Sequence, residues 1–193
     1  PNSPTQRVGR DINQEFTQVA QKYPMLSLGN TYSEEELRDF DQRVRKVVGD
    51  RVQYVCELKY DGTSISLTYV NGELTQAVTR GDGEVGEVVT PNARVFQNIP
   101  LTIPFQGELI LRGEACIRYS DFETINETID DVDARYKNPR NLCSGSVRQL
   151  DNRITAKRCV RFYAFALVSA QGLEMGTRSQ QFDWLSGQGF EVV

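Results

Sequence analysis

The residue types best suited to chemistry stand between Glu57 and Asp61, with Lys59 midway between them. The residues before Lys59 predict a strand with one buried face, whose apolar members are Val52, Tyr54, Cys56 and Leu58. Lys59 would share the opposite face with both carboxylates, beside a cleft. A lysine that is partly desolvated there, near other cations once a ligand binds, would have a lowered pKa and could attack as a neutral amine. The alternative is a solvated lysine at a strand end, since most lysines are solvated.

Two further charged residues stand where a ligand could meet the backbone. Arg80 belongs to the glycine-rich stretch 79–86, where the chain leaves a predicted sheet edge. Glu114 follows Gly113, a break in a predicted strand over 109–117 at which a backbone or a ligand can approach closely. A plain surface loop is the alternative for 79–86, because glycine and aspartate form loops for backbone reasons alone.

A basic segment runs from residue 135 to 161, with eight lysines and arginines against the single acid Asp151. Asn138 and Pro139 predict a helix start, which would place Arg140 in the first turn and Arg148 two turns later on the same side. Both guanidinium groups would then reach one groove. The segment is therefore a candidate for binding phosphate, although a solvated helix face has the same composition.

The amino-acid composition excludes several kinds of catalytic site. The 193 residues carry a net charge of −4 and include no histidine, which excludes Ser-His-Asp hydrolases, Cys-His proteases and histidine general bases. The four cysteines are widely spaced, so we expect reduced thiols and no zinc or other metal site within the chain. No stretch has the length of a membrane span and no signal-peptide pattern opens the chain, so we expect a cytoplasmic protein. The start at Pro1 and the apolar end at Val193 suggest an excised piece.

The predicted elements that position these residues alternate along the chain. A capping box at 33–36 opens a helix over 34–48, and Asn71-Gly72 predicts a hairpin between strands 64–70 and 74–79. The other expectations are an extended segment at 3–9, an irregular connector at 98–104, a capped helix over 120–130, a strand over 161–168, a helix over 181–187 and a strand from 190. We therefore predict an α+β fold of mainly antiparallel sheets flanked by helices.

Six motifs occur together in one order. They are Ser-Pro-Thr-Gln-Arg-Val-Gly (3–9), Pro-Met-Leu-Ser-Leu (24–28), Glu-Leu-Lys-Tyr-Asp-Gly (57–62), Thr-Arg-Gly-Asp-Gly (79–83), Arg-Gly-Glu (112–114) and Asn-Pro-Arg-Asn with Gly-Ser-Val-Arg-Gln-Leu-Asp (138–151). Each is weak alone, but in register they resemble the adenylation domain of bacterial NAD-dependent DNA ligases over essentially the whole chain. The resemblance implies the covalent nucleotidyltransferase fold.

The resemblance also implies roles for individual residues. Lys59 would attack the α-phosphate of NAD and become adenylylated, with Asp61 and Arg80 supporting the lysine and the phosphate. Glu57 would read the adenine amino group, Phe165 would stack on adenine, and Ser27 and Leu28 would line the adenosine site. Glu114 would hold the ribose or assist the metal, and Arg140 and Arg148 would meet phosphates.

For the whole enzyme, the resemblance implies that AMP passes from the lysine to the 5′-phosphate of a nick in double-stranded DNA. The 3′-hydroxyl then seals the nick, in DNA replication and repair. It implies Mg²⁺ or Mn²⁺, a monomer, and Zn²⁺ only in the full-length protein. The region that holds the nicotinamide mononucleotide half of NAD would precede Pro1. Further lysine-bearing strands and the OB-fold, zinc, helix-hairpin-helix and BRCT regions would follow Val193, so we expect residues 1–193 to be inactive alone.

Two departures from the family pattern affect packing. Gln21 stands where a histidine is expected, and Leu142-Cys143-Ser144 replaces a run of alanines.

Two alternative functions remain open. One is an ATP-dependent relative, such as a DNA or RNA ligase or an mRNA capping enzyme, against which the motifs at 3–9 and 138–151 argue. The other is a nucleotide- or nucleic-acid-binding module without turnover, in which the lysine merely contacts phosphate.

Overall fold

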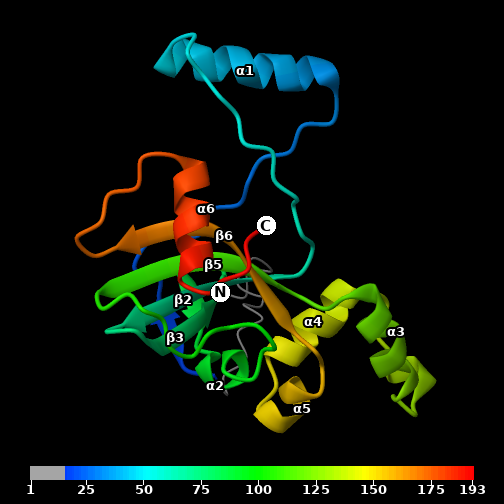
Figure 1. Cartoon of the computed structure of the whole chain (residues 1–193). Helices are drawn as coiled ribbons and strands as arrows, with labels where there is room; N and C mark the ends of the chain where they lie inside the picture. Colours follow the sequence, from blue (N-terminus) through cyan, green and yellow to red (C-terminus); the bar gives the residue numbers. More distant parts are fainter. Residues whose placement is uncertain (1–15) are drawn as a thin grey trace, which may run out of the picture. The chain divides into compact units, whose positions relative to one another are not determined.

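The computed structural model describes residues 16–193, so the predicted extended segment at 3–9 lies outside the described residues. The chain forms two compact units, which are described separately. Of the described residues, 16–25 and 59–193 form the main unit, and Leu26–Leu58 form the small unit (Figure 1). Among the described residues, no helix combines the length and the apolar character needed to cross a membrane.

A four-stranded antiparallel sheet in the order β3-β2-β5-β6 organises the main unit. Its strands are β2 (Thr63–Val70), β3 (Glu73–Thr79), β5 (Glu108–Cys116) and β6 (Arg161–Ala170). The hairpin predicted at Asn71-Gly72 is confirmed: both residues have positive φ, 51° and 82°, as a type I′ turn requires. A two-stranded sheet of β1 (Gln18–Ala20) and β4 (Val85–Glu87) was not predicted.

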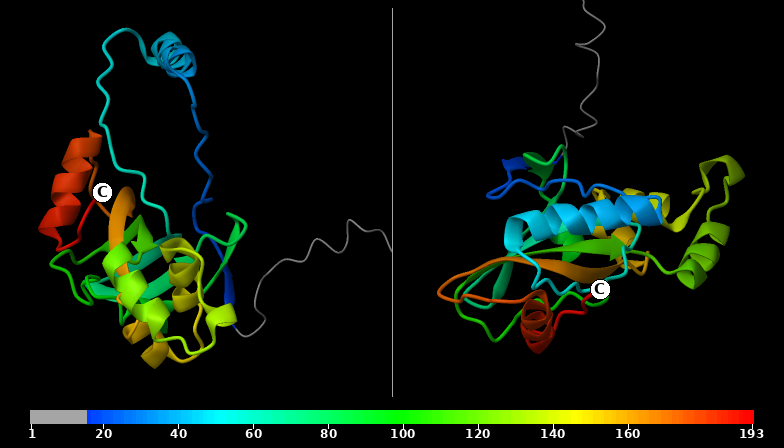
Figure 2. Two further views of the ribbon diagram at one scale, coloured as in Figure 1. Left: turned by 90° about the vertical axis from the view of Figure 1, so that its right-hand side faces the viewer. Right: turned by 90° about the horizontal axis from the view of Figure 1, so that it is seen from above.

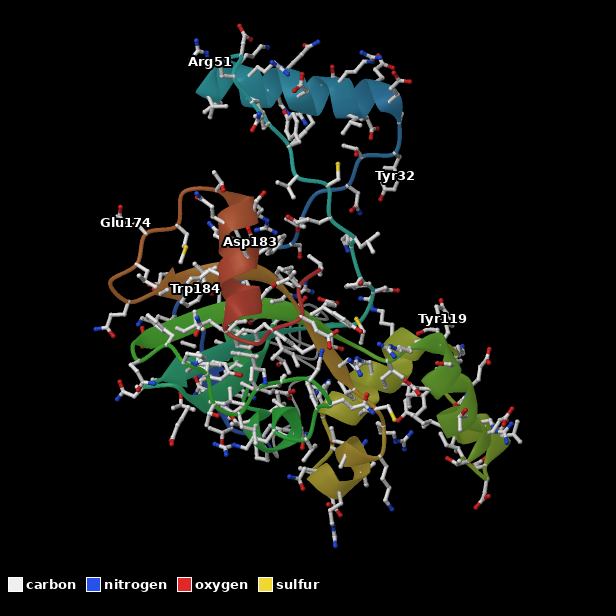
Figure 3. All side chains as sticks on the ribbon, viewed as in Figure 1. Tyr32, Arg51, Tyr119, Glu174, Asp183 and Trp184 are labelled. Carbon is white, nitrogen blue, oxygen red and sulfur yellow. The ribbon has the colours of Figure 1, made fainter. Side chains whose placement is uncertain are left out.

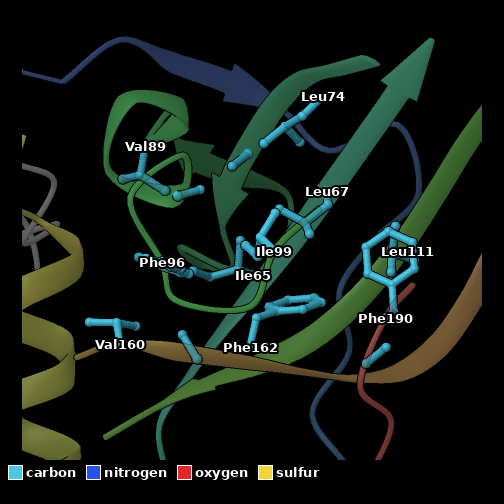
Figure 4. Packing of buried hydrophobic residues seen from close by; sticks show 14 of the residues in the cluster. Ile65, Leu67, Leu74, Val89, Phe96, Ile99, Leu111, Val160, Phe162 and Phe190 are labelled. Atoms are coloured by element: carbon cyan, nitrogen blue, oxygen red, sulfur yellow. The ribbon is translucent and has the colours of Figure 1, made fainter. Parts of the chain in front are cut away.

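One face of the four-stranded sheet carries the hydrophobic core (Figure 4). Ile65 and Leu67 of β2, Leu111 of β5 and Phe162 of β6 are almost wholly buried on that face. They pack with α2 (Thr90–Ala93), the irregular connector that follows it, α4 (Pro139–Val147) and α6 (Arg178–Gly187). The residues that alternate with them point to the other face, so the strand pattern separates a core from a polar surface. The α+β fold with antiparallel sheets is confirmed.

The remaining helices of the main unit are α3 (Tyr119–Glu127), the 3₁₀ turn η2 (Val132–Ala134) and α5 (Asn152–Ala156). Helices α3, α4 and α5 gather at one end of the unit, away from α6 (Figures 1 and 2). Trp184 of α6, labelled in Figure 3, packs edge-on against Phe105, with ring centroids 5.3 Å apart. The strand expected from residue 190 is reduced to one bridge, between Val192 and Ala164.

The predicted capping box at 120–123 is wrong, although the helix is present. Helix α3 begins at Tyr119, and its N-cap is Arg118 with no side-chain cap bond. The chain leaves β5 at Cys116 and turns directly into the helix, so Ser120 already lies inside the first turn. The tertiary path from the sheet therefore decides where this helix starts, not the local Ser-x-x-Glu pattern.

Helix α1 (Glu34–Val48) dominates the small unit and has the predicted bounds. Ser33 Oγ accepts from the Glu36 amide at 3.1 Å, and the Glu36 carboxylate accepts from the Tyr32 amide at 2.7 Å, so the reciprocal bond of the capping box is displaced by one residue. The strand predicted over 52–58 is wrong. Residues 51–61 form no ladder with any described strand, and Leu58 is 69% exposed, because alternation forms a strand only where a neighbouring strand pairs with it.

Candidate active site

A cleft of about 480 Å³ lies in the main unit and brings six predicted site residues together. They are Lys59, Asp61, Arg80, Glu114, Arg140 and Arg148, which come from a loop, a turn, a strand and a helix. Further lining residues that the sequence did not single out are Ser64, Thr79, Glu87 and Ser144. One amine, several carboxylates and three guanidinium groups thus face one space.

Glu114 of β5 fixes the loop that carries Lys59. Its carboxylate accepts from the Gly62 amide at 3.0 Å and from Ser64 Oγ at 2.6 Å. Ser64 lies directly opposite Glu114 in the β2–β5 register, so both side chains share the polar face of the sheet. Gly62 permits this approach, because a Cβ there would lie 1.9 Å from the Ala115 carbonyl oxygen. Gly113, beside Glu114, is itself approached closely by Phe162 and the Tyr163 carbonyl.

Replacing Gly62 by alanine is expected to lower the stability of the chain and to displace the Lys59 loop. The added methyl group would collide with backbone rather than with a flexible side chain, so we expect a loss of roughly 1 to 3 kcal/mol. Thermal unfolding of the 193-residue chain measures the loss. Gly187→Ala is the matched control, because a Cβ there meets nothing within 4 Å. Equal unfolding temperatures for both variants would show that the close approach of Gly62 to the Ala115 carbonyl does not hold the loop.

Burial raises the pKa of Glu114 above its ordinary value of 4.5, and contacts with Ser64, Gly62, Lys59 and Arg140 oppose the rise. The folded protein therefore holds the Glu114 proton more tightly than the unfolded chain does. The stability that this proton contributes is fully present below the ordinary pKa and is lost as the pH rises through the raised value.

Glu114→Gln is therefore expected to flatten the dependence of stability on pH. Glutamine keeps an acceptor for the Gly62 amide but cannot ionise, so the variant should lose less stability than the parent as the pH rises from below 4.5 through the raised pKa of Glu114. Melting temperatures of both proteins across that range provide the measurement. Parallel curves would mean that the burial of this carboxylate does not affect folding.

The two arginines of the basic segment reach the cleft as predicted. Arg140, Ser144 and Arg148 recur every four residues and line the cleft, whereas Leu142, Cys143 and Val147 are buried on the other side of α4. The predicted cap is present, since Asn138 Oδ1 accepts from the Asn141 amide at 2.8 Å. Arg140 pairs with Asp61 at 3.1 Å, and both of these side chains are mostly exposed. An exposed pair of this kind adds little stability, so Arg140 can turn to a ligand.

The glycine-rich turn after β3 forms a wall of the cleft rather than a plain surface loop. Gly81 has a φ of 59°, and a Cβ there would lie 1.8 Å from the Val85 carbonyl oxygen. Asp82 Oδ1 accepts from the Glu84 and Val85 amides, and Arg80 follows directly after the end of β3. Gln21 stands where a histidine was expected. Its Nε2 donates to the Thr79 carbonyl at 2.8 Å, so the glutamine side chain holds the end of β3 where this turn begins.

The remaining predicted residues are not among those that line the cleft. Phe165 is half-buried on β6, where Tyr163 and Phe165 alternate with the buried Phe162 and Ala164. Ser27 and Leu28 belong to an irregular segment of the small unit, in which Leu28 is 79% exposed. Glu57 also belongs to the small unit and is partly exposed.

Sequence reasoning missed Ser64, Thr79, Glu87 and Ser144. Ser64 could have been found, because it opens the polar face of β2. Ser144 stands four residues from each arginine, a spacing that predicts a shared helix face. Thr79 begins the motif at 79–83, in which only Arg80 was given a role. Glu87 carries no local signal, because it reaches the cleft only through the pairing of β4.

The described residues contain no group of three or more metal-binding side chains. Asp61 and Glu114 are nevertheless oxygen donors within the cleft. Magnesium is commonly held by one or two carboxylates together with substrate phosphates, so this donor set fits a metal that arrives with its nucleotide.

A family model described as the NAD-dependent DNA ligase adenylation domain matches residues 13–193. Curated proteins named DNA ligase are similar to the chain, among them those of Lachnoclostridium phytofermentans, 55% identical over 192 residues, and Ruminiclostridium cellulolyticum, 49% identical over 193 residues. The DNA ligase of Cytophaga hutchinsonii is 46% identical over 195 residues. These matches cover at least 99% of the chain but only 28% to 29% of each relative, so the chain spans less than a third of their length.

Proposed function

The chain belongs to the NAD-dependent DNA ligase adenylation domain family, and from this premise we propose that it carries out the adenylation step of a longer DNA ligase. The nitrogen of Lys59 attacks the α-phosphorus of NAD. A nitrogen–phosphorus bond forms, the bond to the bridging oxygen breaks, and nicotinamide mononucleotide leaves. The observation that carries this proposal is the cleft that Lys59 lines together with Asp61, Glu114 and three arginines.

Each cleft residue has a role that its chemistry supports. Asp61 and Arg80 support the lysine and the phosphate, and Arg140 and Arg148 neutralise phosphate charge as it develops. Glu114 accepts from a ribose hydroxyl or assists the metal through the acceptor sites that its bonds to the Gly62 amide and Ser64 leave on the carboxylate. A bound Mg²⁺ or Mn²⁺ would supply Lewis-acid stabilisation of phosphate oxygens.

The adenosine contacts are part of the same proposal. Phe165 offers a flat ring to the adenine face, Glu57 accepts from the adenine amino group, and Ser27 and Leu28 line the adenosine. These four assignments rest on the family resemblance, and their chemistry suits a purine nucleoside.

The later steps belong to the longer protein. We propose that AMP passes from Lys59 to the 5′-phosphate of a DNA nick and that the 3′-hydroxyl then displaces it, in DNA replication and repair. Nicked double-stranded DNA is the partner, and the protein is a cytoplasmic monomer. Regions for the nicotinamide mononucleotide half, the further lysines, an OB-fold, Zn²⁺, a helix-hairpin-helix and a BRCT module would occupy the length that the chain does not cover in its relatives.

Nick sealing by the longer ligase tests the proposal against both alternatives. We expect a labelled nicked duplex to be sealed with NAD and magnesium and not with ATP. Sealing with ATP alone would assign the chain to an ATP-dependent relative. DNA or nucleotide binding without sealing and without AMP transfer would make it a binding module.

A further inference from the structure

Glu87 is a buried carboxylate at the edge of the cleft that no predicted role includes. It is the last residue of β4 and only 4% exposed. Its amide donates to Thr79 Oγ1 at 3.0 Å, which fixes the backbone beside the glycine-rich turn. A carboxylate is rarely buried unless a charged partner or several hydrogen bonds compensate for its lost hydration.

Arg148 is a charged partner of this carboxylate. Arg148 Nη2 donates to Glu87 Oε1 at 3.0 Å, and Arg148 Nε lies 2.8 Å from Glu87 Oε2. Arg148 therefore makes one hydrogen bond and one further charge contact with the same carboxylate, and the two contacts together hold the guanidinium beside Glu87. The side chain of Arg148 remains 33% exposed and still lines the cleft.

The backbone alone does not hold Arg148 in place. It is the C-cap of α4, with φ −105° and ψ 35°, outside the regular helix that supports Arg140. A long side chain at such a site has many rotamers, and ordering it upon ligand binding costs free energy. Arg140 contrasts with it, because its side chain is 61% exposed and contacts Asp61 through one 3.1 Å pair.

We propose that Glu87 is a positioning residue, which holds the Arg148 guanidinium in the orientation that meets a phosphate in the cleft. The inference rests on the proposed function, since it requires a phosphate group as the ligand of Arg148. Glu87 itself contacts no reacting atom. It acts by holding the Arg148 side chain in one orientation before the ligand binds, so that little further ordering of this side chain is needed when the phosphate binds.

Glu87 can also act in the opposite direction, so the sign of the change in sealing rate distinguishes the two effects. A carboxylate beside Arg148 also reduces the positive potential that attracts phosphate. If this neutralisation dominated, removing the charge of Glu87 would strengthen DNA binding and speed the reaction. If positioning dominates, the same change slows it.

A double-mutant cycle in the longer ligase separates these cases. The variants are Glu87→Gln, Arg148→Ala and the double substitution, assayed for sealing of a nicked duplex with NAD. Glutamine has almost the shape of glutamate but turns an amide NH₂ toward an N–H donor of Arg148. We expect Glu87→Gln to slow sealing between about tenfold and a hundredfold in the parent, and less than about twofold once Arg148 is absent.

Several controls distinguish a folding defect from a positioning defect. Glu34→Gln removes a carboxylate from an exposed pair with Arg38 on α1 and should leave sealing unchanged. Melting temperatures are measured for every variant, and the cycle is repeated with Arg148→Lys, which keeps the charge but not the two-point contact. The slope of log KM for nicked DNA against log salt is expected to fall in Glu87→Gln as it does in Arg148→Ala, because both lose the same phosphate contact.

Each outcome decides something different. A parent that does not seal nicks refutes the proposed function. With an active parent, normal or faster sealing by Glu87→Gln overturns the positioning role. So does an equal loss from Glu87→Gln in the presence and absence of Arg148, or normal sealing by Arg148→Ala.

Discussion

Lys59→Ala in the longer ligase is expected to abolish the uptake of AMP from NAD. Lys59 is the amine of the cleft, and alanine offers no nucleophile. Its side chain is exposed, so the substitution should change the free energy of unfolding by no more than about 0.5 kcal/mol. Intact-mass measurement after incubation with NAD and magnesium gives the result, with a melting curve to show that the variant is folded.

Lys59→Arg is the sharper companion variant, because it retains the positive charge and much of the length. An arginine does not lose its proton under these conditions, so this variant should fail as well. Lys46→Ala, an exposed position on α1, serves as the matched control and should label like the parent. Normal labelling of Lys59→Ala would remove the lysine from the mechanism.

Arg140→Ala and Arg148→Ala are expected to slow nick sealing by about a hundredfold each, since each removes a donor aimed at a phosphate whose charge develops during the reaction. The rate of sealing under single-turnover conditions is the measurement. Lys137→Ala, in the same basic segment but outside the cleft lining, should have a much smaller effect. If both arginine variants seal nicks at the parental rate, these side chains only form a solvated face of α4 and take no part in the reaction.

Arg148→Ala and Arg140→Ala should differ in their free energies of unfolding. Arg148→Ala removes a hydrogen-bonding partner of the buried Glu87, and because Arg148 itself is partly exposed we expect a loss of about 1 to 3 kcal/mol. Arg140→Ala breaks an exposed pair and should cost almost nothing. The sealing rates must therefore be compared at a temperature well below the melting point of Arg148→Ala.

The sequence predicted those elements best whose signals are local. Asn71-Gly72 demands positive φ at both positions, which a tight hairpin provides. Asn138 and Pro139 start α4 by side-chain capping and by a fixed φ, and the four-residue spacing then carries Arg140 and Arg148 to one side. Most of the cleft follows from these local rules together with the motifs.

The failures lie where structure depends on distant residues. The alternation at 52–58 is genuine, but no described strand pairs with it, and side-chain pattern alone cannot supply backbone hydrogen-bond partners. Glu87 looks like any acidic residue after a glycine-rich turn. Its burial arises from the pairing of β4 with β1 and from Arg148, 61 residues away, which no local pattern can indicate.

The position of the AMP group tests the central claim most directly. The longer ligase is incubated with NAD and magnesium, digested, and its peptides are sequenced by mass spectrometry, with an ATP incubation in parallel. We predict one AMP per molecule, bound through the Lys59 nitrogen, with NAD and not with ATP. An AMP group on any other residue, or its formation from ATP alone, would contradict the account.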